Sequence, residues 1–318
     1  MRLESCTGEF YDFGTRDEDI HNRFLYDLNA IEKEEVEGLA CSGWATMFGD
    51  LLQDVRKEDK YEFLRWKSLS AMSAISEWIH PSWFVSLIES PEWSTKWFPL
   101  TREINVGHPP NLVFDMGTSP TLIQHAYNLF RYEQSTGHSL TDCDVIFEIG
   151  GGYGSFARLL KNAGFNGLHI IYDLPYVSAI QRMYLTTLGY KEISIKEIGK
   201  KEEHTFCLIQ DRHIDQVNKI LRKKKLNIGF VATWSVSEFP LETRRHVIPR
   251  ITDVCKKFLI SFQPWWEGID NTKYFNCLID AYPKLDWKKF EIGGMGTFNE
   301  ADGKKERPIP NWQTYLMV

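Results

Sequence analysis

Hydrophobic residues recur at helical spacing through the first part of the chain. One series contains Ile20, Phe24 and Leu28, a second runs from residue 44 to 55, and a third runs from residue 61 to 79, before Pro81. Positions three and four residues apart share one face of a helix, so the three series predict three amphipathic helices. Residues 101–120 contain Gly and Pro that break any period, and we expect an ordered loop there.

A further helix is predicted to begin at Ser119 and Pro120. Ser is a favoured N-cap residue, and Pro is tolerated in the first helical turn, where no backbone N–H partner is needed. Leu122, Ile123 and Ala126 then begin an apolar face at helical spacing.

The pattern changes near residue 142 to short apolar runs separated by helical segments. The runs read DVIFEI, LHIIYD, TFCLIQ, NIGFVATW, FLISFQP and finally WQTYLMV. Strands that alternate with helices predict β–α–β units, and therefore an α/β fold with a Rossmann-like, doubly wound and mainly parallel sheet. We expect two regions: a helical N-terminal part over residues 1–140 that covers the site, and a ligand-binding Rossmann-like domain over residues 141–318.

Composition excludes several classes of function. The chain of 318 residues has 37 Lys and Arg against 43 Asp and Glu, a net charge of −6, which repels nucleic-acid backbones and anionic membranes. Its six Cys residues form no Cys-x-x-Cys pair and are expected to be reduced thiols. The N-terminus lacks the apolar stretch of a signal peptide, and nothing approaches the roughly 18–20 apolar residues of a membrane span. We expect a cytoplasmic protein.

The segment DVIFEIGGGYGSFARLL is the most informative motif. A buried strand, a run of glycines and the start of a helix allow a ligand to approach backbone N–H groups closely. The dinucleotide fingerprint G-x-G-x-x-G would require Gly at position 155, where the chain has Ser, so an NAD site is disfavoured. No Lys follows Gly154, which disfavours a phosphate-binding P-loop.

This segment, Glu148-Ile-Gly150-Gly-Gly152-Tyr153-Gly154, resembles motif I of the class I S-adenosylmethionine-dependent methyltransferases. The segment YDLPYV is similar to the Y-D-L-P segment of small-molecule O-methyltransferases. EINVGHPP and Ser235-Val-Ser-Glu238-Phe resemble segments of a bacterial sugar O-methyltransferase family, with His108 in place of the more usual Asn and Phe239 in place of Met. The likeness covers roughly residues 100–318.

The resemblance implies an enzyme that takes S-adenosylmethionine and methylates a hydroxyl of a sugar or sugar nucleotide, in surface polysaccharide or glycan biosynthesis. It places Glu148 near the cofactor's ammonium and the glycine loop beside its methionine and ribose. Asp173 ends the second strand, where an acidic side chain can accept hydrogen bonds from ribose hydroxyls. The expected cofactor-binding residues are Glu148, Gly150, Gly152, Tyr153, Gly154, Asp173, Leu174, Gln210, Asp211, Trp234 and Ser235. A helix N-cap is the alternative role for Gln210 and Asp211, and core packing for Trp234.

Methyl transfer to a hydroxyl requires alignment and a general base. Glu238, directly after the fourth strand, and His108, in the Gly-Pro segment, are the candidates; helix capping and a structural hydrogen bond are their alternatives. Trp265, His125 and Tyr274 are expected near the acceptor, because flat aromatic faces suit sugar C–H groups, although core packing is the commoner role of such residues. No carboxylates show metal-ligand spacing, and we expect no metal.

Two other functions stay open from the sequence. One is an NAD-dependent oxidoreductase, and the other is a non-catalytic, cofactor-binding partner protein, since a cofactor cradle does not guarantee an acceptor site. The identity of the acceptor and the oligomeric state, a homo-oligomer included, are not determined by these patterns.

Overall fold

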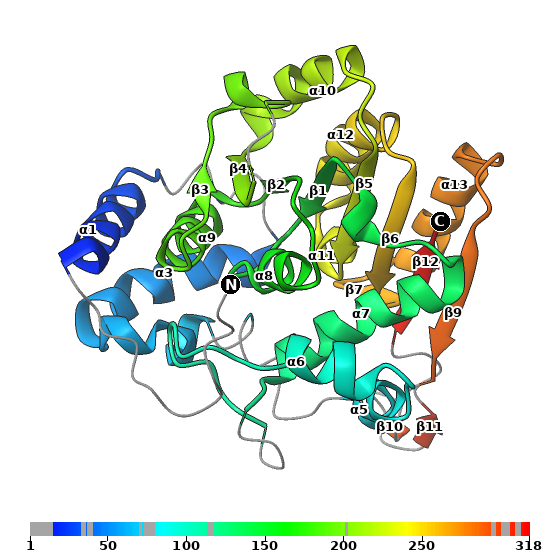
Figure 1. Cartoon of the computed structure of the whole chain (residues 1–318), viewed down its shortest axis with the longest axis horizontal. Helices are drawn as coiled ribbons and strands as arrows, with labels where there is room; N and C mark the ends of the chain where they lie inside the picture. Colours follow the sequence, from blue (N-terminus) through cyan, green and yellow to red (C-terminus); the bar gives the residue numbers. More distant parts are fainter. Residues whose placement is uncertain are drawn as a thin grey trace.

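The computed structural model describes residues 15–32, 36, 41–69, 72, 80–112, 117–200, 203–293, 297–299, 306–308 and 313–318. At its centre lies a sheet of eight strands in the order β3-β4-β2-β1-β5-β6-β12-β9 (Figure 1). Their bounds are β1 Val145–Ile149, β2 Leu168–Tyr172, β3 Lys191–Glu192, β4 Thr205–Ile209, β5 Ile228–Thr233, β6 Lys257–Phe262, β9 Lys288–Ile292 and β12 Gln313–Met317. Each of the six apolar runs found in the sequence forms one of these strands.

The sheet is parallel except at β12, which pairs antiparallel with both β6 and β9. β1 pairs with β2 and β5 in parallel, with Val145 opposite both Leu168 and Ile228. The chain therefore has the predicted Rossmann-like, doubly wound and mainly parallel sheet. Two short antiparallel pairs lie outside it: β7 Trp265–Trp266 with β8 Ile269–Asp270, and β10 Thr297–Asn299 with β11 Glu306–Pro308.

Helices cover both faces of the sheet. One face packs against α10 Ile214–Lys223, α12 Leu241–Thr252 and α13 Asn271–Ala281. The other face packs against α7 Pro120–Thr136, α8 Ser155–Asn162 and α9 Pro175–Thr187. α1 Thr15–Asn29 and α3 Ser42–Lys57 pack on the α9 side, and α5 Pro81–Ile88 packs on α7 (Figure 1). Shorter helical segments are α6 Phe98–Leu100, α11 Ser235–Glu238, Trp93–Trp97, Leu140–Asp142, Ile195–Glu197 and Asp211–His213.

Local signals account for the ends of α7. The Ser119 side chain accepts a hydrogen bond from the backbone N–H of Leu122 at 3.1 Å, and Pro120 is the first helical residue, as predicted. Gly137 ends the helix in the left-handed conformation, which Gly adopts without the steric cost that a Cβ would bring. In the part of the chain that the structure describes, no helix is both long and apolar enough to cross a bilayer.

The predicted helix over residues 61–79 is wrong over residues 61–69, whereas Met72 is helical. Lys60–Arg65 and Lys67–Leu69 form two 3₁₀ helices, separated at Trp66, whose backbone is extended. The Trp66 indole is buried and donates to the carbonyl of Asp59 at 2.9 Å. These tertiary contacts override the helical period. Residues 70–71 and 73–79 of the predicted helix lie outside the described residues.

Candidate functional site

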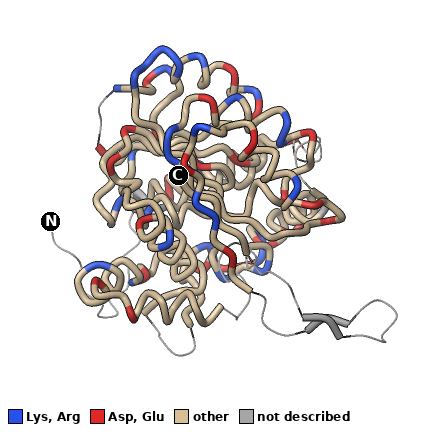
Figure 2. The backbone as a smooth tube through the Cα atoms, turned by 90° about the vertical axis from the view of Figure 1, so that its right-hand side faces the viewer, with Lys and Arg blue, Asp and Glu red and all other residues tan. Residues whose placement is uncertain are grey.

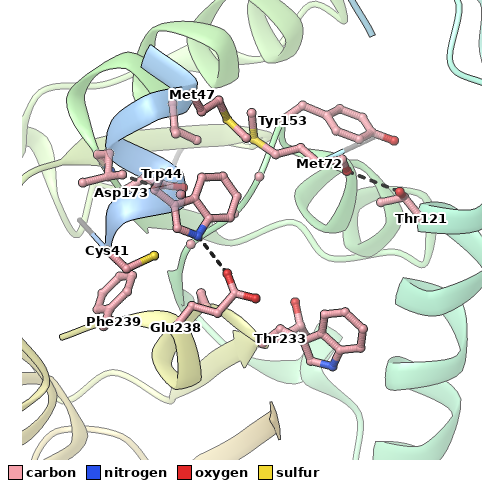
Figure 3. Close-up of a pocket in the computed structure, with 18 of the residues that line it drawn as sticks. Cys41, Trp44, Met47, Met72, Thr121, Tyr153, Asp173, Thr233, Glu238 and Phe239 are labelled. Atoms are coloured by element: carbon pink, nitrogen blue, oxygen red, sulfur yellow. Dashed lines mark hydrogen bonds between the residues drawn. The ribbon is translucent and has the colours of Figure 1, made fainter. Parts of the chain in front are cut away.

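A cavity of about 420 Å³ opens at the carboxyl edge of the central strands. The glycine loop after β1, the residues after β2 and those after β5 form its floor, and α3 and α7 contribute walls (Figure 3). Ligands of doubly wound sheets bind at this edge, where the loops after neighbouring strands meet. Of the expected cofactor-binding residues, the cavity is lined by Gly150, Gly152, Tyr153, Asp173, Leu174, Trp234 and Ser235.

The glycine loop requires Gly at particular positions. Gly150 has φ +70°, and a Cβ built there would lie 2.1 Å from the Cβ of Ser235. Gly152 has φ +54° and faces open space, with no atom within 4 Å of where a Cβ would stand. Gly154 precedes α8 with φ +101° and packs against Tyr184 rather than lining the cavity. The loop thus brings its backbone to the cavity with no side chain at position 150 or 152.

Asp173 is buried at the end of β2, and its carboxylate accepts hydrogen bonds from several donors, the backbone N–H of Gly151 among them. Its Oδ1 accepts from the backbone N–H of Leu174 at 2.8 Å, and its Oδ2 accepts from Gln181 Nε2 at 2.6 Å. The same Nε2 donates to the carbonyl of Gly152 at 2.9 Å, so Gln181 links the carboxylate to the glycine loop. Burial raises the pKa of Asp173 from 3.8 to about 7.

Glu148 lies beneath the glycine loop and does not line the cavity, contrary to its expected place beside a cofactor ammonium. Its Oε2 is 2.7 Å from His169 Nε2, and both side chains are buried. The register pairs Glu148 with Ile171 and Ile146 with His169, so that Glu148 and His169 share one face of two adjacent strands. The pair supports the loop from below.

Glu238 ends α11 and lines the cavity, and its role as a general base stays a prediction. Its Oε2 accepts a hydrogen bond from Trp44 Nε1 at 2.8 Å, drawn in Figure 3, and its Oε1 accepts from Gln263 Nε2 at 3.2 Å. Burial raises the pKa of Glu238, and the bonds from Trp44 and Gln263 act in the opposite direction. Two oriented donors thus hold a half-buried carboxylate at the cavity wall.

A buried arginine supports this position. The Arg244 side chain is fully buried, and its guanidinium donates to the carbonyls of Ser237 at 2.6 Å and Phe239 at 2.8 Å, the residues on either side of Glu238. It also donates to Asn271 Oδ1 at 2.6 Å. No sequence motif pointed to Arg244, because these contacts depend on the packing of α11, α12 and α13.

α3 covers one side of the cavity with Trp44 and Met47, together with Cys41, the residue before the helix. The helix is fixed to α9 because Tyr176 donates its hydroxyl to the carbonyl of Trp44 at 2.8 Å and stacks on Phe48 at 5.3 Å. Sequence reasoning assigned Trp44 and Met47 to the apolar stripe of a helix, and this stripe faces both the core and the cavity (Figure 3).

α7 forms the opposite wall with Thr121, Gln124 and His125. His125 therefore lines the cavity, and its role toward an acceptor stays a prediction. Its Nδ1 is buried and has no hydrogen-bond partner among the described residues. Burial, and then the charge of Arg158, lowers the pKa of His125 to about 3, so the imidazole is neutral.

His108 does not reach the cavity, which corrects its assignment as a second candidate base. Its backbone has φ +50°, its carbonyl accepts from Arg65 Nε at 2.9 Å, and its Nδ1 lies 3.6 Å from Glu62 Oε1. The preceding residue, Gly107, is packed against Phe63, and this contact holds the loop on the 3₁₀ segment.

Trp265 was expected as a pocket wall, but its side chain is 62% exposed and the cavity wall is Trp266. Successive residues of a strand point to opposite sides, and β7 presents Trp266 to the cavity. Tyr274 also lies outside the cavity lining, and its ring centroid is 5.0 Å from the Arg244 guanidinium.

Gln210 and Asp211, expected beside a cofactor, lie outside the cavity lining as well. Gln210 precedes the 3₁₀ helix Asp211–His213 and donates its backbone N–H to His213 Nδ1 at 3.1 Å. It is therefore the N-cap residue of this short helix, which was the alternative role considered for it. Asp211 accepts from Tyr172 at 3.4 Å. Within the described part of the chain, no group of three or more His, Cys, Asp or Glu side chains is placed to hold a metal ion.

Comparison with known proteins gives only weak similarities. No family model matches the chain, and no curated protein matches it. Among solved structures, it is similar to PigF with S-adenosylhomocysteine at 13% identity and a TM-score of 0.32, over 85% of this chain and 69% of that one. It is similar to an S-adenosylmethionine-dependent methyltransferase from Archaeoglobus fulgidus at 13% identity and 0.35, over 59% and 90% of the two chains. It is similar to the glycopeptide N-methyltransferase MtfA at 11% identity and a TM-score of 0.34, over 59% of this chain and 92% of that one. At these TM-scores, the fold assignment depends on the chain's own sheet topology.

Proposed function

We propose that this chain is an S-adenosylmethionine-dependent O-methyltransferase, acting on a hydroxyl of a sugar or sugar nucleotide in surface polysaccharide or glycan biosynthesis. The observation that carries the proposal is a single cavity that joins the glycine loop, the Asp173 carboxylate and the Glu238 carboxylate. The sugar acceptor is supported by the resemblance of residues 103–110 and 235–239 to the sugar O-methyltransferase family.

The cofactor side of the cavity fits this group. Gly150 and Gly152 let the backbone approach a ligand, and Asp173 offers acceptor oxygens suited to ribose hydroxyls. The lining residues include two carboxylates and neither Lys nor Arg among the described residues, which suits a sulfonium cation.

Two features disfavour a dinucleotide instead. Ser155 interrupts the G-x-G-x-x-G fingerprint at the start of α8. The central parallel strands lie in the order β4-β2-β1-β5-β6, which corresponds to the order 3-2-1-4-5 of a dinucleotide-binding sheet. In a dinucleotide-binding sheet a sixth strand comes next, whereas here the next strand is β12, which is antiparallel to β6.

Glu238 is proposed to accept the proton of the acceptor hydroxyl. S-Adenosylmethionine, when bound, supplies a methyl group already activated by a positively charged sulfur. The chain must then align the acceptor oxygen and remove its proton, and Trp44 and Gln263 hold the Glu238 carboxylate in one orientation for that task. A carboxylate with a raised pKa is a stronger base than an exposed one.

Calorimetric titration of the purified chain with S-adenosylhomocysteine and, separately, with NAD tests the cofactor. We expect S-adenosylhomocysteine to bind with a micromolar dissociation constant and NAD to give no signal. Asp173→Ala should weaken binding, whereas Asp211→Ala should leave it unchanged, because Asp211 lies outside the cavity. Binding of NAD without S-adenosylhomocysteine would overturn the proposal in favour of an oxidoreductase.

A further inference from the structure

The acceptor end of the cavity carries negative charge. Glu238 lines it, and Glu267 directly follows the wall residue Trp266. Burial raises the pKa of the Glu238 carboxyl and of the Cys41 thiol, and the nearby charge of Glu267 raises both further. The nearby charge that raises both of these pKa values is therefore a carboxylate.

Two buried arginines beside residues of the cavity lining have other partners. Arg158, behind His125, is buried and pairs with Glu103 at 2.7 Å. Arg244 is occupied by backbone carbonyls and Asn271 and does not line the cavity. Along the outer segments of the backbone, other Lys and Arg positions alternate with Asp and Glu positions (Figure 2). The basic run at residues 222–225 ends α10 and precedes β5, which places it at the amino edge of the sheet, opposite the cavity.

The acceptor end is also small and apolar. Its walls are mainly aromatic rings and thioethers, from Trp44, Met47, Met72, Trp234, Phe239 and Trp266. The whole cavity, at about 420 Å³, lies near the lower end of the range of about 300–1,000 Å³ found for small-molecule sites. Thr121, Gln124 and His125 provide polar atoms on one side, enough to orient a ring hydroxyl but without a positive charge.

We infer that the acceptor is uncharged: a hydroxyl-bearing ring with an apolar face and with neither phosphate nor carboxylate in the cavity. This inference rests on the proposed function and narrows it, because a free or glycosidic sugar fits and the phosphates of a sugar nucleotide do not. A phosphate beside Glu238 would be desolvated next to a like charge, and among the described residues no Lys or Arg lines the cavity to neutralise it. A neutral ring can stack on the indoles while one hydroxyl donates to Glu238.

A matched pair of ligands tests the inference. 4-Nitrophenyl β-D-glucopyranoside and 4-nitrophenyl β-D-glucuronide share the ring and the aglycone and differ by one carboxylate. Each is titrated calorimetrically, at about pH 8, where the glucuronide is ionised, into the chain saturated with S-adenosylhomocysteine. We expect the glucoside to bind at least about tenfold more tightly than the glucuronide, and UDP-glucose to bind no better than the glucuronide.

A variant shows whether charge causes the difference. Met47→Lys adds a cation at a half-buried wall position and should bring the glucuronide to within a few-fold of the glucoside, whereas Met47→Leu should preserve the preference. Glucuronide or UDP-glucose binding as tightly as the glucoside would overturn the inference, as would failure of both glycosides to bind. The S-adenosylhomocysteine titration of the same sample separates these outcomes from failure of the proposed function, in which the cofactor analogue itself does not bind.

Discussion

Replacing Asp173 by Asn removes a buried charge and keeps the shape of the side chain. Burial raises the pKa of Asp173 from 3.8 to about 7, so between these values the folded chain holds a proton that the unfolded chain has released. Stability contributed by this group is therefore complete below about pH 4 and is lost as the pH rises through 7. The full difference between the two pKa values corresponds to about 4 kcal/mol.

Between pH 5 and pH 8, this linkage lowers the unfolding free energy of the wild-type chain by about 2–3 kcal/mol. The amide of the Asp173→Asn variant does not titrate between pH 5 and pH 8, so the variant lacks this contribution to the pH dependence of stability. It also loses the hydrogen bond from Gln181 Nε2, at a cost of about 1–3 kcal/mol that is the same at both pH values. The stability of the variant relative to wild type should therefore increase by about 2–3 kcal/mol from pH 5 to pH 8.

Urea unfolding of both proteins without ligand, at pH 5 and at pH 8, measures how the stability difference between variant and wild type changes with pH. A variant-to-wild-type difference that does not change with pH would refute the assignment of a raised pKa to Asp173. The same variant should bind S-adenosylhomocysteine about 10–100-fold more weakly at pH 8, because the charged acceptor is lost. Asp211→Asn, outside the cavity, is the matched control for binding.

Three further outcomes are expected. Glu238→Gln should lower kcat by about 10²–10⁴-fold with unchanged S-adenosylhomocysteine affinity in calorimetry, and full activity would remove it as the base. Trp44→Phe removes a bond that lowers the pKa of Glu238, so the acidic limb of the kcat/KM profile should move to higher pH; an unmoved limb would contradict the Trp44 contact. Gly150→Ala should cost more than about 2 kcal/mol in urea unfolding because its Cβ meets Ser235, whereas Gly137→Ala, also at φ +70° but in open space, should cost only about 1 kcal/mol. Equal costs would refute the steric argument.

Local patterns were sufficient for most of the fold. Buried parallel strands appear as short apolar runs between helices, and all six runs form strands of the sheet. Ser119 and Pro120 mark the start of α7 because capping depends on residues within one helical turn. The glycine loop and Asp173 could be placed in one cavity because topology brings the carboxyl ends of adjacent parallel strands together.

Contacts between distant segments decided the rest of the candidate site. The sequence does not say which face of a two-residue strand meets the cavity, so Trp265 was chosen where Trp266 forms the wall. Trp44 and Glu238 are 194 positions apart, and their hydrogen bond exists only because α3 packs across α9 and covers the end of β5. Spacing and periodicity describe neighbours along the chain, whereas the surroundings of a base depend on packing between elements, which only the tertiary structure determines.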